Sequence, residues 1–222
     1  MGKITKKLKA DDIGDMGIGA MIVFIAMVLV AGIAASVLIQ TANRLEIQAM
    51  QTGQQTIGEV STGIGVTTIT GARINLTNTN LDRMTIAVQP RSGSYNIDLG
   101  QTYIELSDSS IKVVMKYDSV SFVDTPNING SIYGVTFPAN ASSFGVVVLQ
   151  DADSSLSAAH PVLNSGDQVA LTVNLDQVFS AGPGIAPRIH VWGTIQSEQG
   201  APGVFAFTTP SSYAADLVFT LY

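Results

Sequence analysis

Few residues of this sequence could take part in catalysis. The chain contains no cysteine, and its two histidines are His160 and His190. His190 lies in an alternating strand, where a packing or surface role is favoured, and His160 precedes Pro161 in an expected loop with no obvious partner. No G-x-S-x-G, P-loop or H-E-x-x-H pattern occurs, and no G-x-G-x-x-G precedes a helix. Because an enzyme needs several reactive groups that converge on one site, the sequence predicts a non-enzymatic protein without a cofactor.

Asp151 and Asp153 are weak candidates for metal ligands. Two carboxylates separated by one residue can supply oxygen ligands to calcium or magnesium. Solvated loops often carry such pairs without binding an ion. We therefore expect no metal in this protein.

Three asparagines lie in sequons for N-glycosylation: Asn75-Leu-Thr, Asn129-Gly-Ser and Asn140-Ala-Ser. A sequon matters only where that part of the chain is exported. We expect all three asparagines to lie in or beside turns outside the cell, where a glycan could project.

The charge of the chain is acidic and unevenly distributed. It has 17 acidic and 11 basic residues, which give a formal net charge of −6. Four of the basic residues, Lys3, Lys6, Lys7 and Lys9, lie close to the N-terminus, and those after position 14 are scattered. Such a surface repels nucleic acid, so no nucleic-acid partner is expected.

A long apolar segment follows the lysines. From Met16 to Ile39 there is no charged side chain. A helix of this length rises roughly 36 Å, which is enough to cross the hydrocarbon core of a bilayer. The basic residues before it would remain cytoplasmic and place the rest of the chain outside. The alternatives are a buried helix of a soluble protein and a cleavable secretory signal, whose apolar region is usually shorter.

The helix is predicted to continue beyond the apolar segment, to about Ser61. Apolar residues from Leu38 onward recur at spacings of three and four, which is typical of one helical stripe. In the apolar half, small residues form small-xxx-small pairs that allow helices to approach closely. This pattern favours a helix that packs against copies of itself. The residues expected at these contacts are Ile22, Val23, Phe24, Ala31, Gly32, Ala35 and Leu38.

The rest of the chain is rich in glycine, serine and threonine, with short β-type segments between turn residues. The predicted strands are 83–88, 102–106, 111–117, 120–123, 131–137, 145–149, 169–175, 188–195, 203–208 and 217–222. Strands at this spacing indicate an antiparallel sandwich or barrel. We expect the sandwich, which is immunoglobulin-like in architecture only. The predicted fold class is therefore α+β, with a long apolar helix followed by a β-sandwich outer domain.

Two parts of the sequence resemble the archaellins, the subunits of the archaeal flagellum (archaellum). The first is GDMGIGAMIVFIAMVLVAGIAASVLIQ and its continuation to Ile64. The second combines SGDQVALTVNLDQVF with GIAPRIHVWGTIQSEQGAPGVFAFTTPSSY. Residues 72–160 resemble the family only loosely.

The resemblance implies a class III signal peptide, residues 1–14, that a prepilin-type peptidase removes. The family pattern places the cut after Gly14, so Asp15 would be the first mature residue and Gly17 the third. Archaellins usually carry lysine or arginine just before that glycine, whereas this chain has Asp12 and Ile13. The implied domains are then 1–14, an assembly helix at 15–62 and an outer domain at 63–222.

The function implied by the resemblance is that of a filament subunit. Its partners would be copies of itself, other archaellins where the filament contains them, the peptidase, the membrane before assembly and a separate motor complex that rotates the filament. An adhesive type IV-like pilin is the nearest alternative. Bacterial type IV pilins have glutamate at the fifth mature position, which is Gly19 here, and this difference favours an archaellin. A singly anchored surface protein with an uncleaved helix is a more distant alternative.

Overall fold

The computed structural model describes residues 2–124, 131–179, 184–213 and 216–222. The chain forms two compact units, Met1–Gln55 and Thr56–Tyr222. The described part of the first unit is helical, and the second unit contains the last turn of the same helix and the described strands.

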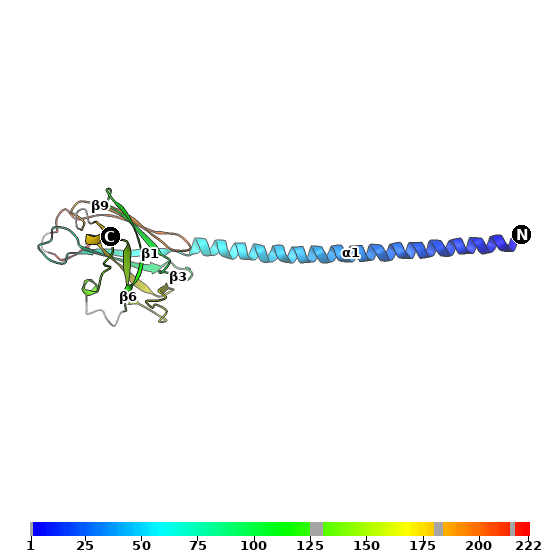
Figure 1. Ribbon diagram of the computed structural model, residues 1–222, viewed down its shortest axis with the longest axis horizontal. Coiled ribbons are helices and arrows are strands. Elements are labelled where there is room, and N and C mark those ends of the chain that lie inside the picture. The colour runs from blue at the N-terminus through cyan, green and yellow to red at the C-terminus, as the bar shows by residue number, and fades with distance from the viewer. Residues whose placement is uncertain (1, 125–130, 180–183, 214–215) are drawn as a thin grey trace. The chain divides into compact units, whose positions relative to one another are not determined.

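Helix α1 runs without interruption from Gly2 to Ser61 (Figure 1). Its end agrees with the prediction, but its predicted start at Met16 was wrong. The residues before Met16 include lysine, leucine and alanine, which favour helix, and no proline, so nothing stops the helix from beginning earlier. By length and composition the part from Met16 to Ser61 could cross a membrane.

The β-strands of the second unit lie between Ile64 and Thr220. They are β1 (Ile64–Ala72), β2 (Arg83–Pro90), β3 (Ile97–Asp98), β4 (Tyr103–Ser107), β5 (Lys112–Val123), β6 (Ser143–Gln150), β7 (Val162–Leu163), β8 (Gln168–Asn174), β9 (His190–Gln196), β10 (Gly203–Thr208) and β11 (Val218–Thr220). The described residues also include the 3-10 helix η2 (Ile132–Gly134) and the short helix α2 (Leu175–Val178).

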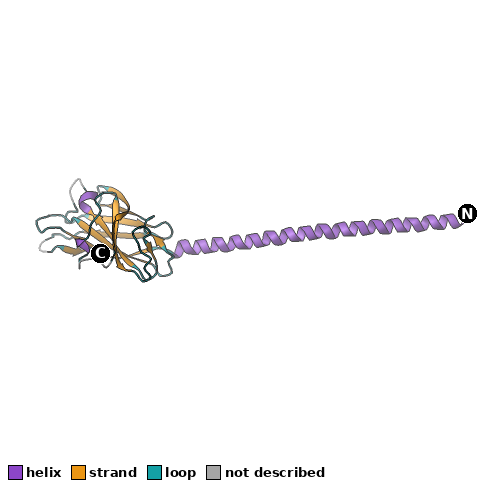
Figure 2. Cartoon of the chain, turned by 60° about the horizontal axis from the view of Figure 1, so that its bottom comes forward, coloured by secondary structure: helices purple, strands orange, loops and turns teal. Residues whose placement is uncertain are grey.

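Nine of these strands form one sheet, in the order β10-β9-β4-β5-β6-β8-β2-β1-β11, and β3 pairs with β7. The neighbours are antiparallel except for β5 and β6, which are parallel. The sheet curls (Figure 2). As a result Gly63, just before β1, forms an isolated bridge with Ala201, two residues before β10. A Cβ atom on Gly203 would lie 3.1 Å from the Ile64 carbonyl oxygen, so the two strands meet closely there.

The hydrophobic core lies on the inner side of this curled sheet. In β10 the side chains alternate, with Phe205 and Phe207 buried and Val204 and Ala206 exposed. The central strands β6 and β8 are buried over most of their length, which explains their continuous apolar sequences. The largest fully buried side chains include Phe144, Phe205, Ile64, Ile69, Met84, Leu106 and Met115.

The predicted fold, a long apolar helix followed by a mostly antiparallel β domain, is confirmed. The layers of the predicted sandwich belong to a single curled sheet, and the predicted strands 111–117 and 120–123 are one strand, β5. Strand β1 was missed because glycine and threonine interrupt the apolar alternation of IGVTTITGA.

The predicted strand 131–137 was wrong. Residues 132–134 form helix η2, whose first turn is closed when the Ser131 hydroxyl accepts a hydrogen bond from the Tyr133 N–H. The Arg83 guanidinium donates to the Tyr133 carbonyl oxygen, and the Tyr133 hydroxyl bonds to Thr70. These contacts hold the segment across the sheet rather than within it.

Candidate assembly surface and processing site

The apolar half of α1 is the largest uncovered apolar surface of the described chain. The large apolar side chains from Met16 to Ile39 are between 53% and 70% exposed. They include the predicted contact residues Ile22, Val23, Phe24 and Leu38. Transfer of each large apolar side chain from water to an apolar environment is favourable by about 1.5–3 kcal/mol. Because monomeric soluble proteins rarely expose such a patch, lipid or other protein must cover this helix.

The small residues of this surface offer room for close approach. Ala31, Gly32 and Ala35 are all exposed, and nothing lies within 4 Å of a Cβ atom placed on Gly32. Ala31 and Ala35 are four residues apart, so they lie on the same face of the helix. A neighbouring helix could therefore approach here more closely than at the larger side chains.

The predicted processing site lies inside α1. Gly14 is exposed, and a Cβ atom on Gly14 or Gly17 would have nothing within 4 Å. The backbone of Asp15 is helical, while its side chain lies outside the described part of the chain. Among the described side chains, none therefore packs against Gly14.

The connection between α1 and the sheet is held from two sides. The Ser94 hydroxyl accepts a hydrogen bond from the Gly63 N–H at 3.3 Å, and the Thr62 hydroxyl accepts one from the Tyr95 N–H at 3.2 Å. On the other side, the Ala201 N–H donates to the Thr62 carbonyl oxygen at 2.8 Å. Sequence reasoning missed these residues, because no local pattern links them.

Gly200 allows the segment before β10 to lie close to Thr62. Its φ is +92°, and a Cβ atom there would lie 2.1 Å from the Thr62 carbonyl oxygen. Both the backbone conformation and the space therefore require glycine. Thr62, the residue that follows α1, is thus fixed to the β domain by backbone contacts.

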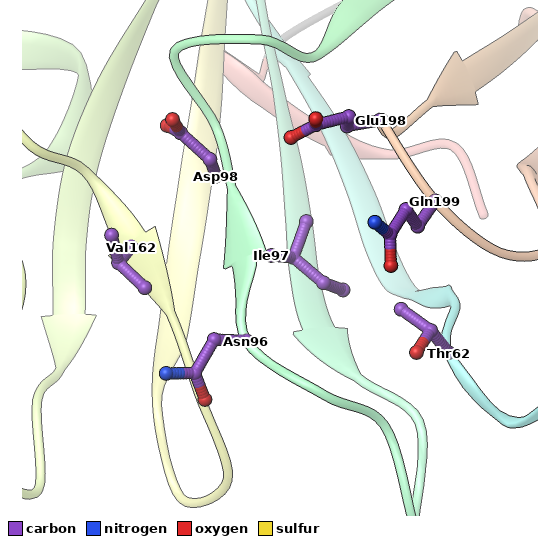
Figure 3. Close-up of a pocket in the computed structure, with 7 residues that line it drawn as sticks. All are labelled: Thr62, Asn96, Ile97, Asp98, Val162, Glu198 and Gln199. Carbon is purple, nitrogen blue, oxygen red and sulfur yellow. The ribbon is translucent and has the colours of Figure 1, made fainter. Parts of the chain in front are cut away.

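A cavity of about 230 Å³ lies beside this connection (Figure 3). It is lined by Thr62, Asn96, Ile97, Asp98, Val162, Glu198 and Gln199. Its polar groups are amides, one hydroxyl and two carboxylates, with no imidazole or thiol. One oxygen of the Asp98 carboxylate already accepts a hydrogen bond from the Gly100 N–H at 2.7 Å. The lining can form hydrogen bonds, but it lacks a nucleophile paired with a base.

The candidate metal ligands Asp151 and Asp153 do lie together, and Asp167 joins them. One carboxylate oxygen from each lies within 4.8 Å of the others. The sequence pattern missed Asp167 because it belongs to a later turn. Such a group could hold a divalent cation through its oxygens.

The same carboxylates already organise their own loop. Asp151 accepts hydrogen bonds from the Ser154 and Leu156 N–H groups, and Asp167 accepts from the Ala152 and Asn164 N–H groups. Hydrogen bonds from Ser155 and then from Asn164 lower the pKa of Asp153 below its ordinary value. These contacts give the three aspartates a structural role in the loop.

Two of the three sequon asparagines can be placed. Asn75 is exposed in the connection between β1 and β2, and Asn140 is exposed in the bend before β6. Asn129 lies outside the described residues. Both described asparagines thus lie in irregular segments at the surface.

The histidines lie in separate surroundings. His160 closes a turn in which its N–H is hydrogen-bonded to Ser157. The Nδ1 atom of His190 lies 3.1 Å from the Thr208 hydroxyl, and its ring lies 5.9 Å from that of Trp192. The surroundings of His190 agree with the packing or surface role expected from the sequence.

Comparison with known proteins identifies the family. A model of archaeal-type flagellin matches residues 14–207. The chain is 40% identical to flagellin B2 of Methanocaldococcus jannaschii, covering 90% of each chain, and 39% identical to flagellin B1 of Methanococcus voltae, covering 96% of this chain and 97% of the relative.

Solved structures also show similarity to archaeal flagellins. The crystal structure of archaeal flagellin FlaB1 from Methanocaldococcus jannaschii matches with a TM-score of 0.61 and 33% identity, covering 72% of this chain and 96% of that chain. The archaeal flagellum of Methanospirillum hungatei matches with a TM-score of 0.59, covering 89% of this chain and 95% of that chain, and at 14% identity this shows a shared fold. The chain therefore belongs to the archaeal-type flagellin family.

Proposed function

We propose that this chain is the repeating subunit of an archaellum filament, which is rotated for swimming. The observation that carries this proposal is the long, uncovered apolar helix α1, found in a chain of the archaeal-type flagellin family. A filament of identical subunits covers such a surface without a dedicated partner. Copies joined head to tail by contacts that do not close generate a helical polymer.

Before assembly the apolar half of α1 is stored in the cell membrane. Its length and composition support this, and so do the lysines that precede it, which favour a cytoplasmic N-terminus. A prepilin-type peptidase then cuts between Gly14 and Asp15. The family match begins at Gly14, and Gly17 falls where archaellins commonly have glycine, which supports this position.

In the filament the same helix packs among its neighbours. Ala31, Gly32 and Ala35 allow close backbone approach, while Ile22, Val23, Phe24 and Leu38 supply apolar area. Burial of many such side chains at about 1.5–3 kcal/mol each makes release of a subunit very unfavourable. The β domain then forms the outer wall of an extracellular filament.

The subunit acts with partners rather than by catalysis. A separate motor and assembly complex supplies the energy for rotation, so the subunit itself needs neither an active site nor a cofactor. Asn75 and Asn140 carry glycans if the host glycosylates its surface proteins, since both side chains are exposed. Asn129 remains a third candidate from the sequence.

Deletion of the gene tests this function. We expect loss of surface filaments in electron micrographs and loss of swimming in soft agar, both restored by the wild-type gene. Deletant cells that swim normally would refute the motility function. Loss of surface attachment with normal swimming would instead indicate an adhesive pilin.

A further inference from the structure

One half of the outer side of the curled sheet is covered by the chain itself. The segment 131–143 crosses β1, β2 and β8. Its Tyr133 hydroxyl bonds to Thr70 at 2.5 Å, and its Pro138 carbonyl oxygen accepts from Asn174 at 3.1 Å. The Phe137 ring lies 4.7 Å from the Arg83 guanidinium. Thr85, on the outer side of β2, is accordingly only 3% exposed.

The other half of the outer side is uncovered among the described residues. We call it the bare face, and it is formed by residues 103–107 of β4, 112–116 of β5, 190–196 of β9 and 203–208 of β10. Outward side chains from these four strands form adjacent rows, since Thr194 pairs with both Val204 and Glu105, and Glu105 pairs with Val114. The apolar members Val204, Trp192, Val114 and Tyr103 are 64%, 43%, 45% and 39% exposed.

The charge of the bare face is opposite to that of the rest of its domain. Lys112 and Lys116 are the two lysines after position 9, and both lie on it. Glu105 is the one acidic residue of its strand segments, and its carboxylate lies 2.8 Å from Lys112. Lys116 forms no ion pair with any described residue. The remainder of residues 56–222 is acidic, with twelve further aspartates and glutamates against four arginines.

We propose that the bare face binds the acidic surface of a second copy of this chain. This inference rests on the proposed filament, in which every outer domain has identical neighbours. An exposed tryptophan among aliphatic side chains, with lysines at the margin, has the composition of a protein–protein contact. Because the positive face meets a different, negative surface of its neighbour, the contact is head to tail and continues along a filament.

The sequons agree with this assignment. None of the bare-face strand segments contains one, and the exposed Asn75 and Asn140 lie in other segments. A glycan on either asparagine would leave the bare face free for a neighbour.

Trp192 permits a direct test because it is the single tryptophan of the chain. Acrylamide quenching of its fluorescence is measured on intact sheared filaments and on subunits dispersed from them in detergent. We expect the quenching constant to fall at least threefold in filaments, with emission at shorter wavelength. Equal quenching in both states would overturn the assignment of the bare face, while the filaments themselves would still support the proposed function.

A pair of matched variants provides a second test. Val204→Glu introduces an acid on the bare face, whereas Val120→Glu introduces the same acid at an 83% exposed valine of β5 outside it. We expect at least a tenfold lower filament yield for Val204→Glu and a nearly normal yield for Val120→Glu. Equal amounts of subunit in the membrane of both strains would show that Val204→Glu folds and inserts. Equal filament yields from the two variants would refute the proposed contact.

Discussion

The ring of Tyr95 lies directly against Gly58 in the last turn of α1. A Cβ atom on Gly58 would come within 3.0 Å of Tyr95 Cε2 and 3.3 Å of its Cδ2. The Tyr95 N–H at the same time donates to the Thr62 hydroxyl just beyond the helix. The side chain and the backbone of one residue thus hold both the last turn and the chain that leaves it.

This contact predicts that Gly58 and Tyr95 are energetically coupled. Gly58→Ala favours the helix by up to about 1 kcal/mol, but the new methyl group crowds the tyrosine ring. We expect the full gain only in a Tyr95→Ala background, and a smaller gain or a loss in the wild type. Thermal unfolding of the dispersed subunit measures this double-mutant cycle.

Gly53→Ala is the matched control, because nothing lies within 4 Å of a Cβ atom at Gly53. Its effect should be the same with and without Tyr95. Equal effects of Gly58→Ala in the two backgrounds would contradict the contact.

Arg73 is predicted to hold the C-terminal strand β11 in place. It is 6% exposed, and its guanidinium donates to the carbonyl oxygens of Asn78 at 2.9 Å and Asp216 at 2.6 Å. Arg73→Ala leaves these acceptors without a charged donor, so we expect a loss of about 3 kcal/mol in the free energy of unfolding. Denaturant unfolding of the dispersed subunit measures it.

The control for Arg73 is Lys116→Ala, since Lys116 is exposed and forms no ion pair with the described residues. Lys116→Ala should change the free energy of unfolding by no more than about 0.5 kcal/mol. A loss of similar size from both substitutions would show that Arg73 has no special role.

Asp176 is predicted to destabilise the β domain at neutral pH. Burial, and then the neighbouring Asp82, raise the pKa of Asp176 above its ordinary value of 3.8. The folded chain therefore keeps this proton at pH values where the unfolded chain has lost it, so stability falls as pH rises from 3.8 through the raised pKa. Asp176→Asn should raise the melting temperature at pH 7 and lose this advantage below the ordinary pKa.

Asp153→Asn should behave in the opposite way. Hydrogen bonds lower the pKa of Asp153, so its charged form contributes stability above the ordinary pKa, and this contribution is lost as pH falls through the lowered one. We expect Asp153→Asn to lower the melting temperature at pH 7 and to have no effect in strong acid. If both variants shifted the melting temperature in the same direction at pH 7, this interpretation of the two carboxyl groups would be contradicted.

Gly32 is predicted to lie at a close helix–helix contact in the filament. Gly32→Glu adds both bulk and a charge that has no partner in the apolar half of α1, at a cost of several kcal/mol. We expect processed subunits in the membrane and no filaments. Gln40→Glu, at a position that is already polar, should assemble. Electron microscopy and membrane fractionation distinguish the outcomes, and normal filaments from Gly32→Glu would exclude a close contact at this residue.

The sequence was sufficient for the elements with a regular pattern. The charge-free segment from Met16 to Ile39 predicted a long apolar helix, and the alternation in GVFAFT predicted the strand that the structure shows as β10. Both patterns follow directly from where the apolar side chains must be buried.

Contacts that depend on the fold could not be predicted from the sequence. Asp167 joins Asp151 and Asp153 only because the loop turns back after β7, and Tyr95 meets Gly58 only because β2 returns beside β1. The segment 131–137 was misassigned because its Tyr133 and Phe137 are typical of strands, whereas contacts with Thr70 and Arg83 decide its conformation.

We propose that this chain is cut after Gly14 and then polymerises through α1. N-terminal sequencing of sheared, purified surface filaments, with the intact mass of the subunit, tests it most directly. We expect filaments built from this chain with Asp15 as their first residue, and an unprocessed chain without filaments when Gly14 is replaced by a bulky residue. Filaments whose subunits begin at Met1, or normal filaments from the Gly14 variant, would contradict the account.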